Sequence, residues 1–266
     1  MHSIKEARHL YESCPLCESI RIRFIGEVDC RKHPLFNPLL PGSIRWMQCD
    51  DCTHSFTEGF FTAEALDILF RKAHDYQVLD LEKLEQARSV SAVMVDKISS
   101  VLGKQEGKWL DVGFGNGALL ITCAEYGFVP VGVDLRRESV ERIQEVGVEA
   151  HCMEFTQLDD FGAFSVISMA DVLEHMPYPK KALAQAEKLL APDGVLLVSC
   201  PNADSLVWKY LTASNINNYW CEIEHYHNFG RLRLYSLLKE HGFTPVNYSV
   251  SKRYRIGMEV ISKKEP

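Results

Sequence analysis

The feature that most constrains the fold is a short apolar run that ends in three alternate glycines, "LDVGFGNG" at residues 110–117. An apolar run of this length is typical of a buried strand, and the stretch that directly follows it has the apolar pattern of a helix. Glycines between a strand and a helix let the backbone turn tightly and approach a ligand closely. The sequence therefore predicts a strand, a ligand-binding turn and a helix at this point.

The chain after Gly107 continues this alternation of strands and helices. Strands that are apolar throughout and separated by amphipathic helices are buried on both faces. The pattern predicts an α/β fold with a mainly parallel sheet and helices on both faces. We expect helices at 118–127, 139–147, 179–191 and 232–242, and strands at 108–113, 129–134, 148–153, 164–170, 194–200, 245–253 and 257–264.

The first part of the chain has a different character. Five of the nine cysteines fall within residues 14–52, where prolines are frequent and helical periodicity is weak. Such a segment is typical of a small module held by something other than a large core. Helical periodicity returns from Phe61 to Leu102. We therefore divide the chain into a cysteine-rich module at 1–60, a helical linker or lid at 61–104 and an α/β domain at 105–266.

Composition excludes several classes of protein. Apolar residues make up 46% of the 266 residues, which is enough for a core, and the formal net charge of -7 makes a broad face for nucleic acid unexpected. The first residues lack the basic-then-apolar layout of a signal peptide. No stretch approaches the roughly eighteen apolar residues of a membrane span. We expect a cytoplasmic protein with no membrane partner.

The glycine turn alone leaves its ligand open. Gly113, Gly115 and Ala118 fit the dinucleotide fingerprint G-x-G-x-x-G/A, and Asp134 closes the next predicted strand, where that fingerprint places an acid against ribose hydroxyls. Asp111 shifts the balance, because a carboxylate beside the turn repels dinucleotide phosphates and attracts an ammonium group. A phosphate-binding loop of the G-x-x-x-x-G-K-[ST] type is absent from the sequence. These residues favour an adenosine-bearing ligand that also carries an ammonium group, while a purely structural turn stays an alternative.

Five ordered stretches resemble the class I S-adenosylmethionine-dependent methyltransferases. They include "KWLDVGFGNGALL", "FSVISMADVLEHMPYPKKAL" and "LLAPDGVLLVSCPN", and the resemblance covers roughly residues 85–264. A series of motifs in a fixed order is far more specific than one glycine turn. The resemblance implies a Rossmann-like, seven-stranded methyltransferase sheet with helices on both faces and an antiparallel last strand near 257–264.

The resemblance also implies a cofactor site. Carried over by position, Gly113, Gly115 and Gly117 would line the methionine half of S-adenosylmethionine, Asp111 would lie near its ammonium group, and Asp134 would hold its ribose hydroxyls. Family members often carry an aspartate after the third strand, where this chain offers a glutamate. The further cofactor contacts implied are Leu135, Glu154, Phe155, Met169, Ala170 and Asp171.

Three histidines are candidates for a general base that takes a proton from the methyl acceptor: His175, His225 and His227. A local hydrogen bond at a helix start is the competing explanation for His175. His225 and His227 alternate in sequence, so in a strand only one of them would face a substrate. Nearby aromatic residues, Trp208, Tyr210, Tyr219, Trp220 and Tyr226, would either form an acceptor pocket or pack as a lid.

Two C-x-x-C pairs, Cys14–Cys17 and Cys49–Cys52, predict a structural zinc site, because each pair supplies two thiolates to a tetrahedral ion. A competing ligand set is Cys14, Cys17, Cys30 and His33. That set would be similar to zinc-bearing ribosomal RNA methyltransferases, whereas "WMQCDDCTHSF" resembles the zinc-ribbon end of bacterial methyltransferases associated with sugar nucleotides, surface polysaccharides and natural products.

The sequence therefore predicts an enzyme that transfers a methyl group from S-adenosylmethionine to a small-molecule acceptor, such as a nucleotide sugar or a related metabolite, and that carries structural Zn²⁺. Methylation of an RNA base is the alternative within enzymes. A cofactor-binding or partner-binding protein without catalysis, with the zinc module as its docking surface, is the alternative outside them.

Overall fold

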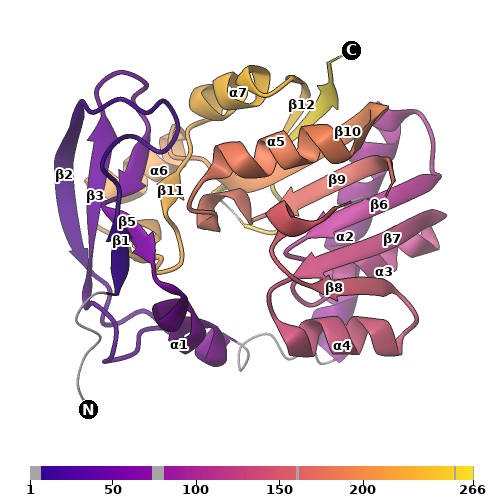
Figure 1. Ribbon diagram of the computed structural model, residues 1–266, viewed down its shortest axis with the longest axis horizontal. Helices are drawn as coiled ribbons and strands as arrows, with labels where there is room; N and C mark the ends of the chain where they lie inside the picture. Colours follow the sequence, from indigo (N-terminus) through magenta and orange to yellow (C-terminus); the bar gives the residue numbers. More distant parts are fainter. Residues whose placement is uncertain (1–6, 74–80, 160–161, 255, 266) are drawn as a thin grey trace. The chain divides into compact units, whose positions relative to one another are not determined.

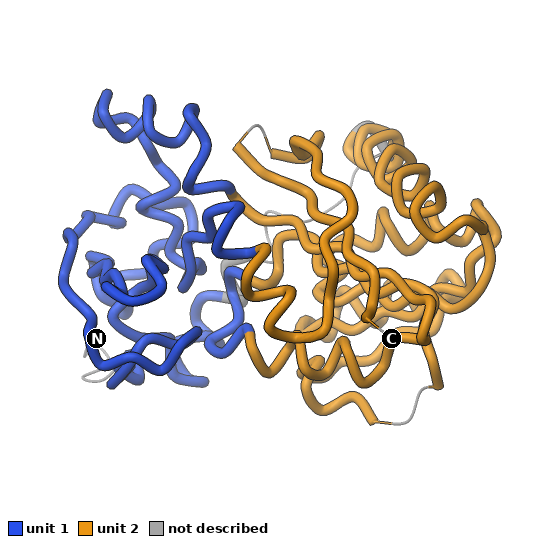
Figure 2. The backbone as a smooth tube through the Cα atoms, turned by 90° about the horizontal axis from the view of Figure 1, so that it is seen from above, with its two compact units in different colours: residues 1–77, 174–179, 202–234 blue, residues 78–173, 180–201, 235–266 orange. Residues whose placement is uncertain are grey.

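The computed structural model describes residues 7–73, 81–159, 162–254 and 256–265. The chain divides into two compact units, coloured separately in Figure 2. The first unit holds residues 1–77, 174–179 and 202–234, and the second holds residues 78–173, 180–201 and 235–266. Two late segments of the sequence thus belong to the same compact unit as the cysteine-rich region. The division by composition at residues 60 and 104 stays a prediction about independently folding pieces.

The second unit contains the predicted seven-stranded sheet, in the order β12-β13-β10-β9-β6-β7-β8 (Figure 1). Five strands run parallel to their neighbours, and β13 is antiparallel to both β10 and β12, as the resemblance implied. The strands are β6 (Gly107–Val112), β7 (Phe128–Asp134), β8 (Glu149–Cys152), β9 (Phe164–Ala170), β10 (Leu190–Pro201), β12 (Phe243–Val250) and β13 (Gly257–Lys264).

Helices cover both faces of this sheet because its central strands are apolar on both sides. Alternate residues of β9 and β10, such as Val166 and Leu197, pack with Trp109 in a core that includes Met94 and Leu119 of two helices. The residues between them in β9 and β10 are equally buried, and α5 lies over the opposite face in Figure 1. The helices of this unit are α2 (Leu81–Leu102), α3 (Ala118–Glu125), α4 (Arg137–Glu145) and α5 (Pro179–Leu189).

The first unit is built on a four-stranded sheet in the order β11-β4-β3-β2, beside a ribbon of β1 and β5. Its late strand β11 pairs antiparallel with β4, so that His227 lies opposite Phe56. The strands are β1 (Arg8–Leu10), β2 (Ile22–Asp29), β3 (Ser43–Cys49), β4 (Ser55–Thr57), β5 (Gly59–Phe61) and β11 (His227–Asn228). This pairing could not be predicted from the sequence, because a two-residue strand is too short to show a periodic pattern.

Three more helices complete the described chain: α1 (Ala63–Ala73), α6 (Leu206–Ala213) and α7 (Arg231–Glu240). The helix predicted from Phe61 begins at Ala63, and its expected end at 74–77 lies outside the described residues. Among the helices that the structure describes, none combines the length and the apolar character needed to cross a membrane.

A buried ion pair joins α2 to the sheet. Lys97 Nζ lies 2.7 Å from Glu259 Oε2 and donates a second hydrogen bond of 2.9 Å to Ser249 Oγ. The side chain of Glu259 is 1% exposed. A carboxylate buried to this degree is stable only when an opposite charge or strong donors compensate it.

We predict that Lys97→Met lowers the free energy of unfolding by about 3 kcal/mol, because the substitution leaves the carboxylate of Glu259 buried without its cation. Urea denaturation followed by circular dichroism measures the loss. Adding Glu259→Gln to Lys97→Met removes the uncompensated charge and should recover part of the stability. Equal stability of the single and double variants would contradict this account.

Candidate functional site

The glycine turn lies at the carboxyl end of β6, where ligands collect in parallel sheets. Gly113, Gly115 and Gly117 all have left-handed backbones, with φ of 62°, 61° and 78°. The Gly113 N–H donates to the carbonyl of Val133 at 2.7 Å, which fixes the turn against β7. Residues with a Cβ avoid this region, so the sequence of three glycines follows from the conformation.

Two of these glycines also have no room for a side chain. A Cβ at Gly113 would lie 2.7 Å from a methyl group of Val172, and a Cβ at Gly117 would overlap Ile143. The turn is therefore a cradle of left-handed glycines that is close-packed against these two side chains. A cradle of this kind suits a ligand that lies directly against peptide groups.

Asp134 closes β7 beside this cradle and is 4% exposed. Its carboxylate accepts hydrogen bonds from the Gly115 N–H at 3.0 Å and from the Arg136 N–H at 2.9 Å. The guanidinium of Arg136 adds two more, at 2.9 Å and 2.7 Å. Since a carboxylate has about four acceptor positions, Asp134 can accept ribose hydroxyls only where Arg136 gives up a bond. No sequence motif pointed to Arg136.

Asp111 lies in β6, the strand next to β7, and a chain of hydrogen bonds holds its buried carboxylate. Trp109 Nε1 donates to Ser168 Oγ at 2.8 Å, and Ser168 Oγ donates to Asp111 Oδ1 at 2.6 Å. Burial raises the pKa of Asp111 to about 7, although the bond from Ser168 and the charge of Arg253 act in the opposite direction. A raised carboxyl pKa in this position means that a bound cation would stabilise the ionised form.

Asp171 follows β9 in the left-handed region, with φ of 59°. Ser199 Oγ donates to its Oδ1 at 3.0 Å, and Arg253 Nη2 lies 3.3 Å from its Oδ2. Arg253 also donates to the carbonyl of Ala170 at 3.3 Å. Arg253 could not be predicted from the sequence, because it lies shortly before β13 and no local pattern links it to β9.

The remaining predicted cofactor residues are distributed unevenly around this edge. Met169 and Ala170 are buried in β9, and Phe155 is buried just after β8. Leu135 is 49% exposed, and Glu154 is exposed as the residue that begins a short 3-10 helix. Leu135 and Glu154 are therefore accessible to a ligand, whereas Met169, Ala170 and Phe155 are buried, and cofactor contact by all five stays a prediction.

The four cysteines of the two C-x-x-C pairs come together in the first unit. One sulfur from each of Cys14, Cys17, Cys49 and Cys52 lies within 4.8 Å of the others. The Cys14–Cys52 and Cys17–Cys49 sulfur separations are 3.6 Å and 3.5 Å. Tetrahedral zinc with bonds of about 2.3 Å places its sulfur ligands at about 3.8 Å from one another, so this donor set fits the ion.

The competing ligand set is not brought together. Cys30 Sγ donates to the carbonyl of Pro41 at 3.6 Å, and His33 Nε2 lies 3.0 Å from the carboxylate of Glu222. Both contacts hold the long connection after β2 in place.

Two of the three predicted histidines belong to a second cluster in the first unit. One donor atom from each of Glu174, His175 and His225 lies within 4.8 Å of the others. His175 Nδ1 donates to the carbonyl of Glu224 at 3.0 Å, and the imidazole rings of His175 and His225 meet edge to face with centroids 4.6 Å apart. Burial is the main reason why the pKa of His225 lies well below its usual range, and the charge of the neighbouring His175 acts in the same direction.

The third histidine is engaged elsewhere. His227 Nε2 donates to the carbonyl of Met176 at 3.0 Å, so in the neutral ring Nδ1 accepts from His54 Nε2, also at 3.0 Å. Burial lowers the pKa of His227 to about 3. With both nitrogens hydrogen-bonded, His227 ties β11 to Met176 and to His54.

The amide of Asn228, which follows His227, is 4% exposed, and neither of its side-chain atoms has a hydrogen-bond partner among the described residues. A buried amide of this kind is available to a ligand. The sequence carried no signal that could have singled out Asn228.

The aromatic residues near these histidines mainly pack together. Trp208 and Trp220 meet with ring centroids 5.3 Å apart, and Trp220 also meets Trp46 edge to face at 5.2 Å. Tyr210 is 70% exposed. The packing explanation therefore accounts for Trp208 and Trp220.

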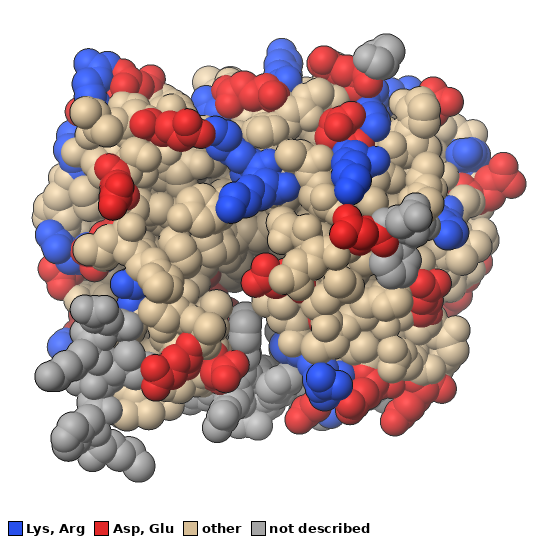
Figure 3. Space-filling view, viewed as in Figure 1, with Lys and Arg blue, Asp and Glu red and all other residues tan. Residues whose placement is uncertain are grey.

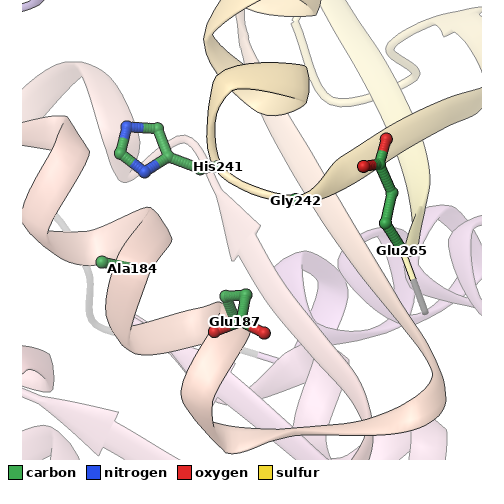
Figure 4. A pocket seen from close by; sticks show the side chains of 5 residues that line it. All are labelled: Ala184, Glu187, His241, Gly242 and Glu265. Atoms are coloured by element: carbon green, nitrogen blue, oxygen red, sulfur yellow. The ribbon is translucent and has the colours of Figure 1, made fainter.

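A separate surface pocket lies at the opposite edge of the sheet. Its side chains Glu187, His241 and Glu265 surround one space in Figure 4, beside Ala184 and Gly242. The strand register places Lys264 opposite Phe243, next to the start of β10 rather than to its carboxyl end. This pocket is therefore distinct from the edge that carries the glycine turn.

A family model described as a methyltransferase domain matches residues 85–248, more than half of the chain. The chain belongs to the S-adenosylmethionine-dependent methyltransferases. The matched range contains the glycine turn, Asp111, Asp134 and the Glu174–His175–His225 cluster. Among curated relatives, a ubiquinone biosynthesis O-methyltransferase from Haemophilus ducreyi is 32% identical over 118 residues, which are 40% of this chain and 49% of that protein. The chain thus spans about half the length of this relative.

Solved methyltransferases share the fold. The 1,6-didemethyltoxoflavin-N1-methyltransferase of Burkholderia thailandensis, solved with its acceptor and S-adenosylhomocysteine, aligns with a TM-score of 0.58 at 19% identity and covers 82% of this chain and 98% of its own. The magnesium protoporphyrin IX methyltransferase of Synechocystis PCC 6803, bound to S-adenosylhomocysteine, aligns with a TM-score of 0.54 at 17% identity, over 71% of this chain and 89% of its own. At such low sequence identities, the likeness shows only that this chain shares the fold of these methyltransferases.

We predict that Asp111→Asn weakens S-adenosylmethionine binding about tenfold or more, because the amide cannot attract the cofactor ammonium. Since the pKa of Asp111 is raised to about 7, wild-type affinity should fall as the pH drops below 7, while the variant should show no such fall. Isothermal titration between pH 5.5 and 8.5 measures both effects, with exposed Asp193→Asn as the control.

Asp111→Asn should weaken cofactor binding but raise the stability of the free protein. The folded state holds the Asp111 proton more tightly than the unfolded chain, whose pKa is 3.8, so this group lowers the stability of the free protein as the pH rises from about 4 to about 7. At pH 8, Asp111→Asn should therefore have a higher melting temperature than the wild type. A lower melting temperature at pH 8 would contradict the burial argument.

Proposed function

We propose that this methyltransferase transfers a methyl group to a hydroxyl oxygen of a small molecule, such as a nucleotide sugar or a related metabolite, and that the Glu174–His175–His225 cluster activates this acceptor. The observation that carries the proposal is the cluster itself, a buried carboxylate with two imidazoles. The H. ducreyi relative is named as an O-methyltransferase, which supports oxygen as the accepting atom. The zinc-ribbon resemblance of the first unit supports the nucleotide-sugar class.

The residues of the glycine turn would hold the cofactor in this proposal. Gly113, Gly115 and Gly117 would offer backbone, Asp111 would offer a charge to the ammonium, and Asp134 would accept the ribose hydroxyls. When bound, S-adenosylmethionine supplies a methyl group already activated by its sulfonium sulfur, which keeps the bonding electron pair when the acceptor oxygen takes the methyl carbon. The protein then has to orient the acceptor, exclude water and remove the acceptor proton.

His225 is the central activating residue in this proposal. Its ring is 8% exposed, and its Nδ1 has no hydrogen-bond partner among the described residues. A neutral imidazole with a free lone pair can accept a proton directly, as the sequence predicted, or can hold a cation that acidifies the acceptor. Asn228 offers a buried amide for orienting polar groups of the acceptor.

Surface charge supports a small acceptor rather than a nucleic acid. On the face drawn in Figure 3, lysine and arginine side chains are interspersed with aspartate and glutamate. Affinity for RNA depends on basic residues that gather along a phosphate backbone.

We predict that His225→Gln lowers kcat about a hundredfold or more, because removal of an acid-base or acceptor-activating group typically costs this much. The cofactor dissociation constant should stay unchanged, since His225 lies outside the glycine turn. The measurement is methylation of a pool of nucleotide sugars and related metabolites read by mass spectrometry, with S-adenosylmethionine affinity measured in parallel.

Exposed His9→Gln is the matched control and should keep full activity. Full activity of His225→Gln would remove the proposed role of the cluster. If the wild type binds the cofactor but methylates none of these metabolites, the acceptor class is wrong and a non-catalytic role gains ground.

We further propose that Cys14, Cys17, Cys49 and Cys52 hold structural Zn²⁺. Cys49→Ser should lower the zinc content from one ion per chain to near zero and make the first unit sensitive to protease, because a structural zinc site contributes directly to folding. Elemental analysis of the purified protein measures the zinc. Cys30→Ser removes a buried thiol outside the cluster and should keep the ion. Loss of zinc from Cys30→Ser would favour the competing ligand set.

A further inference from the structure

His54 lies two residues after the second C-x-x-C pair, and its backbone belongs to the turn of that pair. The Cys49 N–H donates to the carbonyl of His54 at 3.0 Å, and the His54 N–H donates to the sulfur of Cys52. Thr53, which lies between Cys52 and His54, has a left-handed backbone with φ of 60°, as a tight turn requires. Both backbone polar groups of His54 are thus bound to this pair, so the pair determines where the imidazole begins.

The imidazole of His54 is held in one orientation by burial and by neighbouring rings. His54 is 1% exposed. Its ring stacks on Phe56 with centroids 6.0 Å apart and 9° between the ring planes, and it also meets Phe229 with centroids 5.0 Å apart. A side chain packed in this way in a core stays in one rotamer. His54 therefore presents its Nε2 in a fixed direction.

Two hydrogen bonds, here called the histidine bridge, lead from His54 to the segment that carries His175. His54 Nε2 lies 3.0 Å from His227 Nδ1, and His227 Nε2 lies 3.0 Å from the carbonyl oxygen of Met176. A carbonyl only accepts, so His227 Nε2 carries a proton, His227 Nδ1 accepts, and His54 Nε2 is the donor. The direction of both bonds in the bridge is thereby fixed.

The bridge ends directly beside His175. Met176 is the next residue in the chain, and His175 is the last residue of a short 3-10 helix. On its other side, His175 Nδ1 donates to the carbonyl of Glu224 at 3.0 Å. His175 is therefore held between the histidine bridge and its own bond to Glu224. Loss of the bridge would leave the carbonyl of Met176 without this donor and allow the segment to shift.

A shift of His175 would also change the position of His225. The two rings meet edge to face with centroids 4.6 Å apart. In the proposed function His225 activates the acceptor, and a misplacement of about 1 Å can lower a rate about a hundredfold. The histidine bridge therefore acts on the reaction through position and without contact with the acceptor.

We propose that His54 is a positioning residue for the acceptor-activating cluster, which it reaches through His227 and the carbonyl of Met176. The inference rests on the proposed function, because it concerns the step in which the cluster activates the acceptor. It also gives the proposed zinc site a second task besides stabilising the first unit. The turn that would hold the ion fixes His54, and His54 fixes the segment that carries His175, so zinc binding and methyl transfer are coupled within the first unit.

NMR spectroscopy of the histidine rings tests the bridge in the full-length wild type, with zinc in the four-cysteine site and without cofactor or acceptor. Long-range correlation of ring protons with ring nitrogens identifies the protonated nitrogen. His227 should carry its proton on Nε2 with Nδ1 unprotonated, and His54 should carry a proton on Nε2. A proton on Nδ1 of His227 would exclude the bond from His54 and overturn the proposal.

His54→Phe keeps a ring and the backbone of the turn but removes the donor to His227. We expect kcat to fall about tenfold or more, with the KM of the methylated metabolite changed less than about twofold, because position rather than binding is affected. Zinc content and cofactor affinity should stay those of the wild type. The ring signals of His175 should shift, although the substitution lies two hydrogen bonds away.

His54→Gln is the conservative variant, because its side-chain amide keeps an N–H donor for His227. It should recover most of the kcat lost in His54→Phe and restore the His175 signals. Exposed His9→Phe is the matched control in the same unit and should change neither. If His54→Phe does not fold, the wild-type ring protonation and His54→Gln decide the question.

Three outcomes would overturn the positioning role. An unchanged kcat or unshifted His175 signals in His54→Phe would show that the bridge does not position the cluster. Loss of zinc together with loss of activity would show that His54 only supports the four-cysteine site. His54→Gln as impaired as His54→Phe would show that ring packing matters and the donor does not.

The two proposals fail in different ways. A wild type that binds the cofactor and methylates none of the tested metabolites would refute the proposed acceptor class. The ring signals of His175 in His54→Phe and His54→Gln would still decide whether His54 positions that residue, because they are measured without acceptor.

Discussion

The left-handed backbone between β6 and α3 is the constraint on which the cofactor-binding unit depends. Gly113 and Gly117 have positive φ and also lie where a Cβ would overlap Val172 or Ile143. The turn is therefore close-packed against these two side chains, and only glycine fits it at both positions. Because Gly115 donates its N–H to Asp134, the same turn also fixes the carboxylate at the end of the next strand.

Burial of carboxyl groups at this edge of the sheet determines how readily they ionise and bind a cation. Asp111 is fixed by Ser168 and Trp109 in the middle of the sheet, and desolvation raises its pKa to about 7. A group held at this cost to stability is well prepared to bind a cation, because the cation restores the interactions that burial removed. Asp134 shows the opposite case, since Arg136 and two backbone N–H groups already satisfy it.

The first unit shows how a late segment of a chain can complete an early one. Strand β11 pairs with β4, and Tyr226 donates its N–H to the carbonyl of Glu174, so residues that are far apart in sequence form one buried group. The acceptor-activating cluster proposed above therefore depends on chain segments that also build the unit holding the four cysteines. A substitution in either segment affects both packing and chemistry.

Much of the fold, and the choice of the four clustered cysteines, could be predicted from local sequence patterns. Apolar strands, amphipathic helices and the glycine turn predicted an α/β fold with a mainly parallel sheet, because these signals lie within a few residues of one another. The resemblance to the methyltransferase family implied the seven strands and the antiparallel last strand. The C-x-x-C spacing likewise predicted which four cysteines meet. Only the tertiary structure separated His225 from His227, assigned Cys30 and His33 to other contacts, and brought Arg253 to Asp171. These outcomes depend on burial and on hydrogen bonds between distant segments, which a linear pattern does not encode.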